Sequence, residues 1–211
     1  DGGIPSVALY AFADPRPMVD ERQGDGYLGF LGFPLGSTPP GPFQFSSPFP
    51  STWGTKITAM VGTSVLRALP GGTPDDFTQG LSTSDVAGNF VGETLVPRLG
   101  MATGAKVNGL DLGQDQASVG LTPTLTWAPP SLGTPKGYGV DIYRLALSRG
   151  QTYRTLQARF VLNPGRQSFT IPQGILTFGS KYVAVLLTVN TPTTSSKIFT
   201  APLPYDVSVV V

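Results

Sequence analysis

The chain has 211 residues, of which 40% are hydrophobic, enough to build the core of one large domain or two small ones. It has no histidine and no cysteine, which excludes disulfides, imidazole or thiolate metal sites, and Ser-His-Asp or Cys-His catalysis. Only 13% of residues are charged, the formal net charge is +1, and no stretch approaches the roughly 20 apolar residues of a membrane-spanning helix, so we expect neither a nucleic-acid partner nor a transmembrane segment.

The N-terminal half shows short alternating patterns between turns. With 27 glycines and 21 prolines spread between apolar stretches, turns are frequent and long helices are not expected. The best helical candidate, residues 61–68, is short, and part of it also alternates as a strand does. The alternation predicts strands at 6–12, 26–33, 55–61, 63–69, 89–96 and 105–112.

Residues 32–54 form a Pro-rich segment with interleaved phenylalanines. Proline lacks the amide donor of a central strand, so we expect an ordered loop, pinned by its aromatic side chains, or an edge. Exposed aromatic rings could also stack on sugar faces. The candidates for such a carbohydrate platform are Tyr27, Phe43, Phe45, Phe49 and Trp53.

Acidic residues gather at three turns. Residues 20–26 and 110–116 each surround a glycine turn, and Asp75 with Asp76 forms a third acidic site. None has the spacing of an EF-hand loop, and turn residues are the simpler interpretation. We expect no cofactor, with calcium as the ion that these turns would take if they bound one.

Two carboxylates can catalyse glycoside hydrolysis without histidine. The chain has two glutamates, Glu21 and Glu93, and nothing in the sequence brings a carboxylate pair into one cleft. The sequence therefore favours a protein that is not an enzyme, and a carboxylate-only enzyme stays an alternative.

From residue 121 onward, the strand pattern becomes regular. Turns recur every eight to twelve residues, the spacing of a β-sandwich, which places a domain boundary near residue 113. The predicted organisation is all-β with two sandwich-like modules, residues 1–112 and 113–211. The strands of the second module are predicted at 121–130, 137–147, 152–162, 167–176, 181–190 and 205–211.

Residues 117–211 resemble a fibronectin type III domain. Leu125 and Trp127 in "TLTWAPP", then "GYGVDIYR" and "LTFGSKYVAV", match its second, third and sixth strands. The resemblance implies that Trp127 lies in the core. It also implies a corner, formed by Leu176 and Tyr182, in which the tyrosine hydroxyl bonds back to the backbone.

In the N-terminal half, "DVAGNF" resembles a turn of transthyretin-like, carboxypeptidase-regulatory-type sandwiches. Asp85, Gly88 and Phe90 stand at the matching positions. Because Asp-x-x-Gly is also a common hairpin signal, a β-rich fold is the broader expectation for residues 1–112.

The segment "KYVAVLLTVN" (181–190) is apolar on both faces. If Tyr182 points inward, alternation sends Ala184 and Leu186 inward as well, and the next side chains outward. Together with the neighbouring strand this predicts a second apolar face that must be covered by the N-terminal half or by another protein. That predicted interface consists of Tyr143, Leu145, Val183, Val185 and Leu187.

The resemblance implies a non-catalytic extracellular or cell-surface module that acts in adhesion, assembly or protein binding, and we expect a secreted, bacterial protein. Its partner would be another protein or a second copy. One alternative is a carbohydrate-binding accessory module of a polysaccharide-degrading system, which requires coplanar exposed aromatics near Trp53. Another is a structural subunit that polymerises through a strand edge, with an N-terminal segment or the final strand "DVSVVV" paired to another chain.

Overall fold

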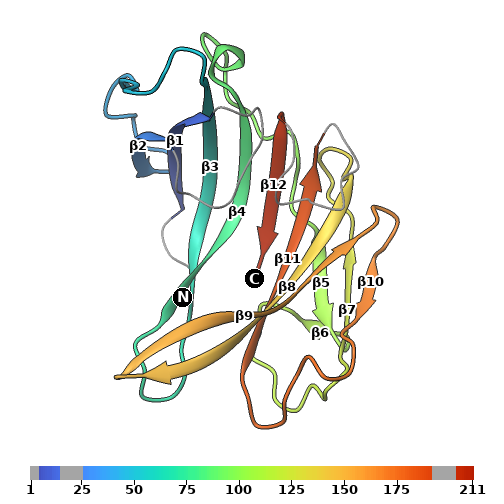
Figure 1. Cartoon of the computed structure of the whole chain (residues 1–211). Helices are drawn as coiled ribbons and strands as arrows, with labels where there is room; N and C mark the ends of the chain where they lie inside the picture. The colour runs from blue at the N-terminus through green and yellow to red at the C-terminus, as the bar shows by residue number, and fades with distance from the viewer. Residues whose placement is uncertain (1–4, 15–25, 192–202) are drawn as a thin grey trace.

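The computed structural model describes residues 5–14, 26–191 and 203–211, and within them nearly all regular structure is β (Figure 1). The strands form two antiparallel sheets, one of eight strands and one of four. The prediction of an all-β, sandwich-like fold is confirmed.

The eight-stranded sheet runs through both halves of the chain, in the order β2-β1-β3-β4-β12-β11-β8-β9. Its N-terminal strands are β1 (Ser6–Asp14), β2 (Tyr27–Pro34), β3 (Gly54–Arg67) and β4 (Asp75–Val86). Its C-terminal strands are β8 (Gly137–Ser148), β9 (Gln151–Leu162), β11 (Tyr182–Asn190) and β12 (Tyr205–Val210). The two sets meet where β4 pairs with β12.

The smaller sheet has the order β10-β7-β5-β6 and packs on one face of the C-terminal strands. Its strands are β5 (Thr103–Val107), β6 (Leu110–Asp111), β7 (Thr124–Ala128) and β10 (Ser168–Thr170). The core between the sheets contains Trp127, Tyr138, Val140 and Leu186. Since β5 pairs with β7, the strands on either side of residue 113 belong to one sheet.

Residues 61–68 lie in a strand, so the helical candidate is wrong. The two strands expected at 55–61 and 63–69 are one continuous strand, β3. Gly62 lies within this strand, at a point where the β4 backbone approaches closely. A Cβ at Gly62 would lie 2.7 Å from the Gln79 carbonyl oxygen, so a larger side chain would not fit there. A glycine in a strand can mark such a close approach as well as a break.

The strand expected at 89–96 is absent from the structure, whereas β4 was not expected. Residues 87–89 form the short 3₁₀ turn η1 (Ala87–Asn89), and the chain then continues without regular pairing. In β4, the sequence "DDFTQGLSTSDV" is too polar to show the apolar alternation of a strand. Pairing with β3 and β12 on its two sides holds it in the sheet.

Candidate functional site

The five residues of the predicted interface lie where the alternation placed them, on the face of β8 and β11 opposite the sandwich core. Leu145, Val183, Val185 and Leu187 are buried, and Tyr143 is half-buried. They belong to a second apolar cluster that also contains residues of β12. The structure therefore has an apolar core on each side of β11.

Side chains from the N-terminal half pack into this second core. Phe77 of β4 is buried there, and Val65 and Leu69 pack against the same cluster. The Phe77 and Tyr143 rings meet edge to face, with centroids 5.7 Å apart. Part of the predicted interface thus joins the N-terminal and C-terminal strands of the same chain.

The tips of two long hairpins meet beside this core, and we call this contact the hairpin clasp (residues 69–76 with 150–154). The Thr73 amide donates to the Gly150 carbonyl at 2.9 Å, and the Thr152 amide donates to the Thr73 carbonyl at 2.9 Å. The Leu69 amide donates to Thr152 Oγ1 at 3.0 Å. Arg154 lies 4.3 Å from the Phe77 ring centroid and donates to the Asp76 carbonyl. These contacts bring β9 back against the β3–β4 hairpin.

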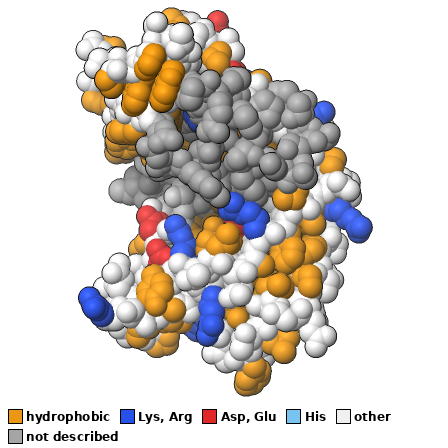
Figure 2. All heavy atoms as spheres, viewed as in Figure 1, with side chains coloured by type: hydrophobic (Ala, Val, Ile, Leu, Met, Phe, Trp, Pro, Cys, Tyr) orange, Lys and Arg blue, Asp and Glu red, His pale blue; other side chains and the backbone are white. Residues whose placement is uncertain are grey.

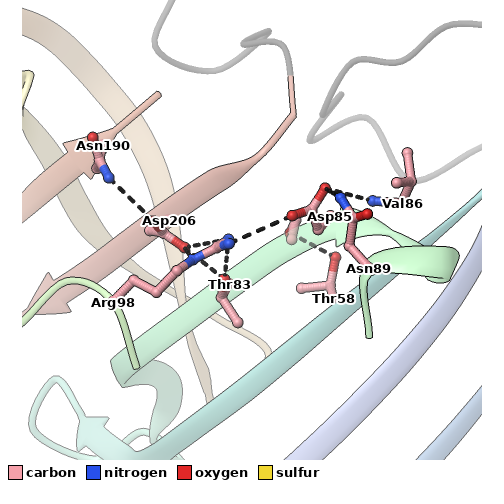
Figure 3. Close-up of polar contacts among 9 residues, drawn as sticks. Thr58, Thr83, Asp85, Val86, Asn89, Arg98, Asn190 and Asp206 are labelled. Carbon is pink, nitrogen blue, oxygen red and sulfur yellow. Dashed lines mark hydrogen bonds and ion pairs between the residues drawn. The ribbon is translucent and has the colours of Figure 1, made fainter. Parts of the chain in front are cut away.

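Arg98 anchors a polar network at the β4–β12 junction (Figure 3). Its Nε lies 2.9 Å from Asp206 Oδ1, its Nη2 donates to Thr83 Oγ1 at 2.7 Å, and its Nη1 lies 3.4 Å from Asp85 Oδ2. Asp206 also accepts bonds from Thr83 and from Asn190. Both carboxylates are buried and share the single positive charge of Arg98, so this cluster is a structural junction between strands.

Asp85 lies at the end of β4, beside the turn whose sequence resembles the transthyretin-like motif. Its Oδ1 accepts from the Val86 amide at 2.8 Å and from Asn89 Nδ2 at 3.0 Å. Asp85 therefore holds the η1 turn from one oxygen and binds Arg98 through the other.

A second buried carboxylate, Asp141 of β8, also pairs with an arginine. Arg159 of β9 binds it in a bidentate manner, with Nε–Oδ1 2.8 Å and Nη2–Oδ2 2.7 Å. Tyr143 donates to Asp141 Oδ2 at 3.3 Å. Burial and the charge of Asp141 raise the pKa of the Tyr143 hydroxyl. The arginine compensates the buried charge across two neighbouring strands.

The acidic turns bind their own surroundings. Asp75 lies 3.9 Å from Arg154, Asp76 accepts from Ser64 at 3.0 Å, and Asp111 accepts from the Gly113 amide at 2.8 Å. Within the described ranges, no three acidic side chains gather in positions suited to a metal ion. Asp20, Glu21 and Asp25, the acidic residues of the turn at 20–26, lie outside the described residues.

Hydrophobic side chains gather on the surface formed by β1, β2 and the loop that follows β2, at one end of the eight-stranded sheet (Figure 2). Tyr10 stands opposite Phe30 with ring centroids 5.0 Å apart, and Phe12 stands opposite Tyr27 at 5.9 Å. Tyr27 and Phe30 are 59% and 52% exposed, more than most large hydrophobic side chains of a folded domain. We call these four residues the aromatic strip.

The opposite face of β2 is covered by the Pro-rich loop. Phe43 and Phe45 contact each other at 5.3 Å between centroids, and both would lie within 4 Å of a Cβ at Gly29. Phe49 and Trp53 stack face to face at 4.9 Å with an interplanar angle of 4°. Aromatic contacts therefore fix a loop that has no regular secondary structure from 35 to 53.

Sequence reasoning named Tyr27 and the loop aromatics but missed Tyr10, Phe12 and Phe30. The missed signal in 6–12 is the alternation, which places Tyr10 and Phe12 on one face of the strand. Tyr27 and Phe30 are three positions apart and would lie on opposite faces of a regular strand, so 26–33 carries no such signal. Their meeting depends on the register of β1 with β2, which follows a β-bulge next to Leu28 and cannot be read from either strand alone.

The part of the chain that the structure describes contains no helix long and apolar enough to span a membrane. Comparisons of the sequence with protein-family models and curated proteins, and with solved structures, found no match.

Proposed function

We propose that this chain is a non-catalytic extracellular or cell-surface module that binds protein in adhesion or assembly. The observation that carries the proposal is the aromatic strip, an exposed apolar surface at the free end of a large sheet. Exposed contiguous apolar surface of this kind is typical of protein interaction sites, and aromatic residues are enriched at such sites.

The proposed scaffold is a fibronectin type III-like sandwich formed by residues 117–211. In support, β8 and β11, matched to the third and sixth strands, are neighbours in one sheet, while β7, matched to the second, lies in the other. Trp127 is buried in the core. Tyr182 Oη accepts the Thr177 amide at 2.9 Å, which is the backbone bond expected of the corner.

A role without catalysis is supported by how the carboxylates are used. Asp85 and Asp206 share Arg98, and Asp141 pairs with Arg159. Glycoside hydrolysis by two carboxylates needs both of them to reach the substrate, whereas these three are buried in ion pairs between strands.

The aromatic rings also bear on the carbohydrate alternative. Phe49 and Trp53 are parallel, but each covers one face of the other. The rings of the aromatic strip are tilted by 43° and 66° across the strands, and the nearly parallel rings of Tyr10 and Phe12, at 17° along β1, are half-buried. Sugar stacking uses open ring faces side by side, so this packing favours a protein partner over a polysaccharide.

The polymer alternative pairs another chain with an N-terminal segment or with the final strand. That strand, β12, lies between β4 and β11, so both of its edges are paired within the chain. Among the described strands of the eight-stranded sheet, β2 and β9 each have one edge without a strand partner.

The test is retention of extracellular proteins and soluble polysaccharides on immobilised wild-type chain, compared with Phe30→Lys and with the control Leu156→Lys on β9, where the leucine is also exposed. We expect a protein that is retained by the wild type and the control and lost with Phe30→Lys. Retention of the same proteins by all three chains would contradict the proposal. Polysaccharide retention that Trp53→Ala abolishes would favour the alternative.

A further inference from the structure

We propose that β2 pairs in antiparallel fashion with β2 of a second copy of this chain, joining two eight-stranded sheets across a two-fold axis. This inference rests on the proposed function, because it names the partner of the same aromatic surface.

Over residues 29–33, the edge of β2 lacks the features that usually keep edge strands apart. The strand "YLGFLGFP" carries no charge, and its proline stands at the last position. Natural edge strands are usually protected by charges, interior prolines or bulges. The β-bulge beside Leu28 leaves residues 29–34 as a regular segment. At the other end of the sheet, β9 carries Arg154 and Arg159 and has a bulge near its middle.

The hydrogen-bond pattern shows which groups face outward from β2. The Leu35 amide donates to the Pro5 carbonyl at 2.8 Å, in the register that pairs Ser6 with Pro34. Because antiparallel pairs alternate between bonded and non-bonded, the backbone groups of Leu31 point toward β1, and those of Phe30 and Gly32 point away from it. The open edge therefore presents the amides and carbonyls of Phe30 and Gly32, while the outward carbonyl of Pro34 already accepts the Ser37 amide at 3.1 Å.

One two-fold register uses all of these groups. Placing Phe30 of one copy opposite Gly32 of the other gives four hydrogen bonds, with Leu31 facing its own counterpart at the axis. The registers displaced by two residues lose bonds, since one brings in the bulge at Leu28 and the other brings in Pro34, which has no amide hydrogen.

The side chains fit the same register. Each phenylalanine lies opposite a glycine, and aromatic rings that cover glycines stabilise paired strands. Within one chain the Phe30 ring already covers Gly32, since a Cβ at Gly32 would lie 2.5 Å from that ring. The perpendicular two-fold axis keeps the aromatic strips of both copies on one face, where they form one continuous apolar surface.

The first experiment is sedimentation velocity of the full chain over a wide concentration range. We expect a reversible monomer–dimer equilibrium in the wild type, at least about tenfold weaker in Phe30→Lys because two like charges face each other near the axis. The control Leu156→Lys should dimerise as the wild type does. A wild type that is monomeric at every concentration overturns self-pairing.

The second experiment fixes the register by disulfide trapping, which is clean because the chain contains no cysteine. A non-bonded antiparallel pair brings Cα atoms to about 4.5 Å, within disulfide range. Leu31→Cys should therefore form a covalent dimer on mild oxidation, and Leu156→Cys should not. Equal cross-linking of both variants overturns the register. A wild type that does not pair with itself, but captures a different protein that Phe30→Lys fails to capture, would overturn this inference alone. The proposed function would then stand.

Discussion

Arg98 is the residue on which two buried carboxylates depend. Replacing it by methionine leaves Asp85 and Asp206 without their shared cation. We expect a loss of about 2–3 kcal/mol in the free energy of unfolding, less than for a fully buried pair because the Arg98 side chain is 38% exposed. Urea unfolding measures the loss. The exposed Arg166→Met is the control, and an equal effect of the two substitutions would contradict this role.

Tyr143 predicts how stability responds to alkaline pH. Its pKa is raised above 10.0, first by burial and then by the charge of Asp141, so the fold favours the neutral hydroxyl. That contribution to stability is fully present below the unfolded pKa and is lost as the pH rises through the folded pKa. Tyr143→Phe should therefore lose less stability than the wild type between neutral and alkaline pH, measured by urea unfolding. Equal losses would contradict the assignment.

At the scale of residues, the sequence predicted local geometry better than distant polar contacts. The Leu176–Tyr182 corner depends on a short spacing, and Tyr182 bonds to a residue five positions away. Burial raises the Tyr182 pKa, but its hydrogen bonds to Thr177 and Ser180 and the charge of Arg144 outweigh burial and lower it. Arg98 and Asp206 are 108 residues apart, and only the pairing of β4 with β12 brings them together.

The hairpin clasp is an interaction between elements. Thr152 is almost fully buried and accepts the Leu69 amide across the clasp. Thr152→Val keeps the side-chain shape and removes the acceptor, so we expect a loss of about 1–2 kcal/mol in unfolding free energy. Amide exchange at residues 69–73 should accelerate as well.

The matched control for the clasp is Thr155→Val on the same strand, at an exposed position. It should leave both measurements near the wild-type values. Faster exchange at residues 69–73 in the control, or no change in Thr152→Val, would show that the clasp does not depend on this bond.

At the scale of elements, β4 shows why apolar patterns are incomplete. Most of its side chains are polar, and they are satisfied by partners that only the sheet supplies: Thr83 binds Asp206, and Ser84 contacts Thr58 at 2.8 Å. Strands 6–12 and 26–33 were predictable because their alternation is local. The segment 89–96 was also predicted from its local alternation, but it gains no strand partner among the described residues.

At the scale of the whole molecule, β11 separates two apolar cores, one between the sheets and one shared with the N-terminal hairpin. Val185→Glu places a carboxylate in the second core, where Val185 is 6% exposed. We expect a loss of about 3 kcal/mol or more, with earlier melting by circular dichroism. Unchanged melting would contradict the burial of this face.

We expect the N-terminal and C-terminal strands to unfold together in one cooperative transition, because β4 pairs with β12 and both sets of strands share the second core. The chain has two tryptophans, Trp53 in the N-terminal half and Trp127 in the sandwich core. Urea unfolding followed by fluorescence in Trp127→Phe and in Trp53→Phe reports each half separately. Circular dichroism of the same variant is recorded beside each fluorescence curve. We predict that, in both variants, fluorescence and circular dichroism report the same midpoint. Two separated transitions would contradict the coupling of the two halves.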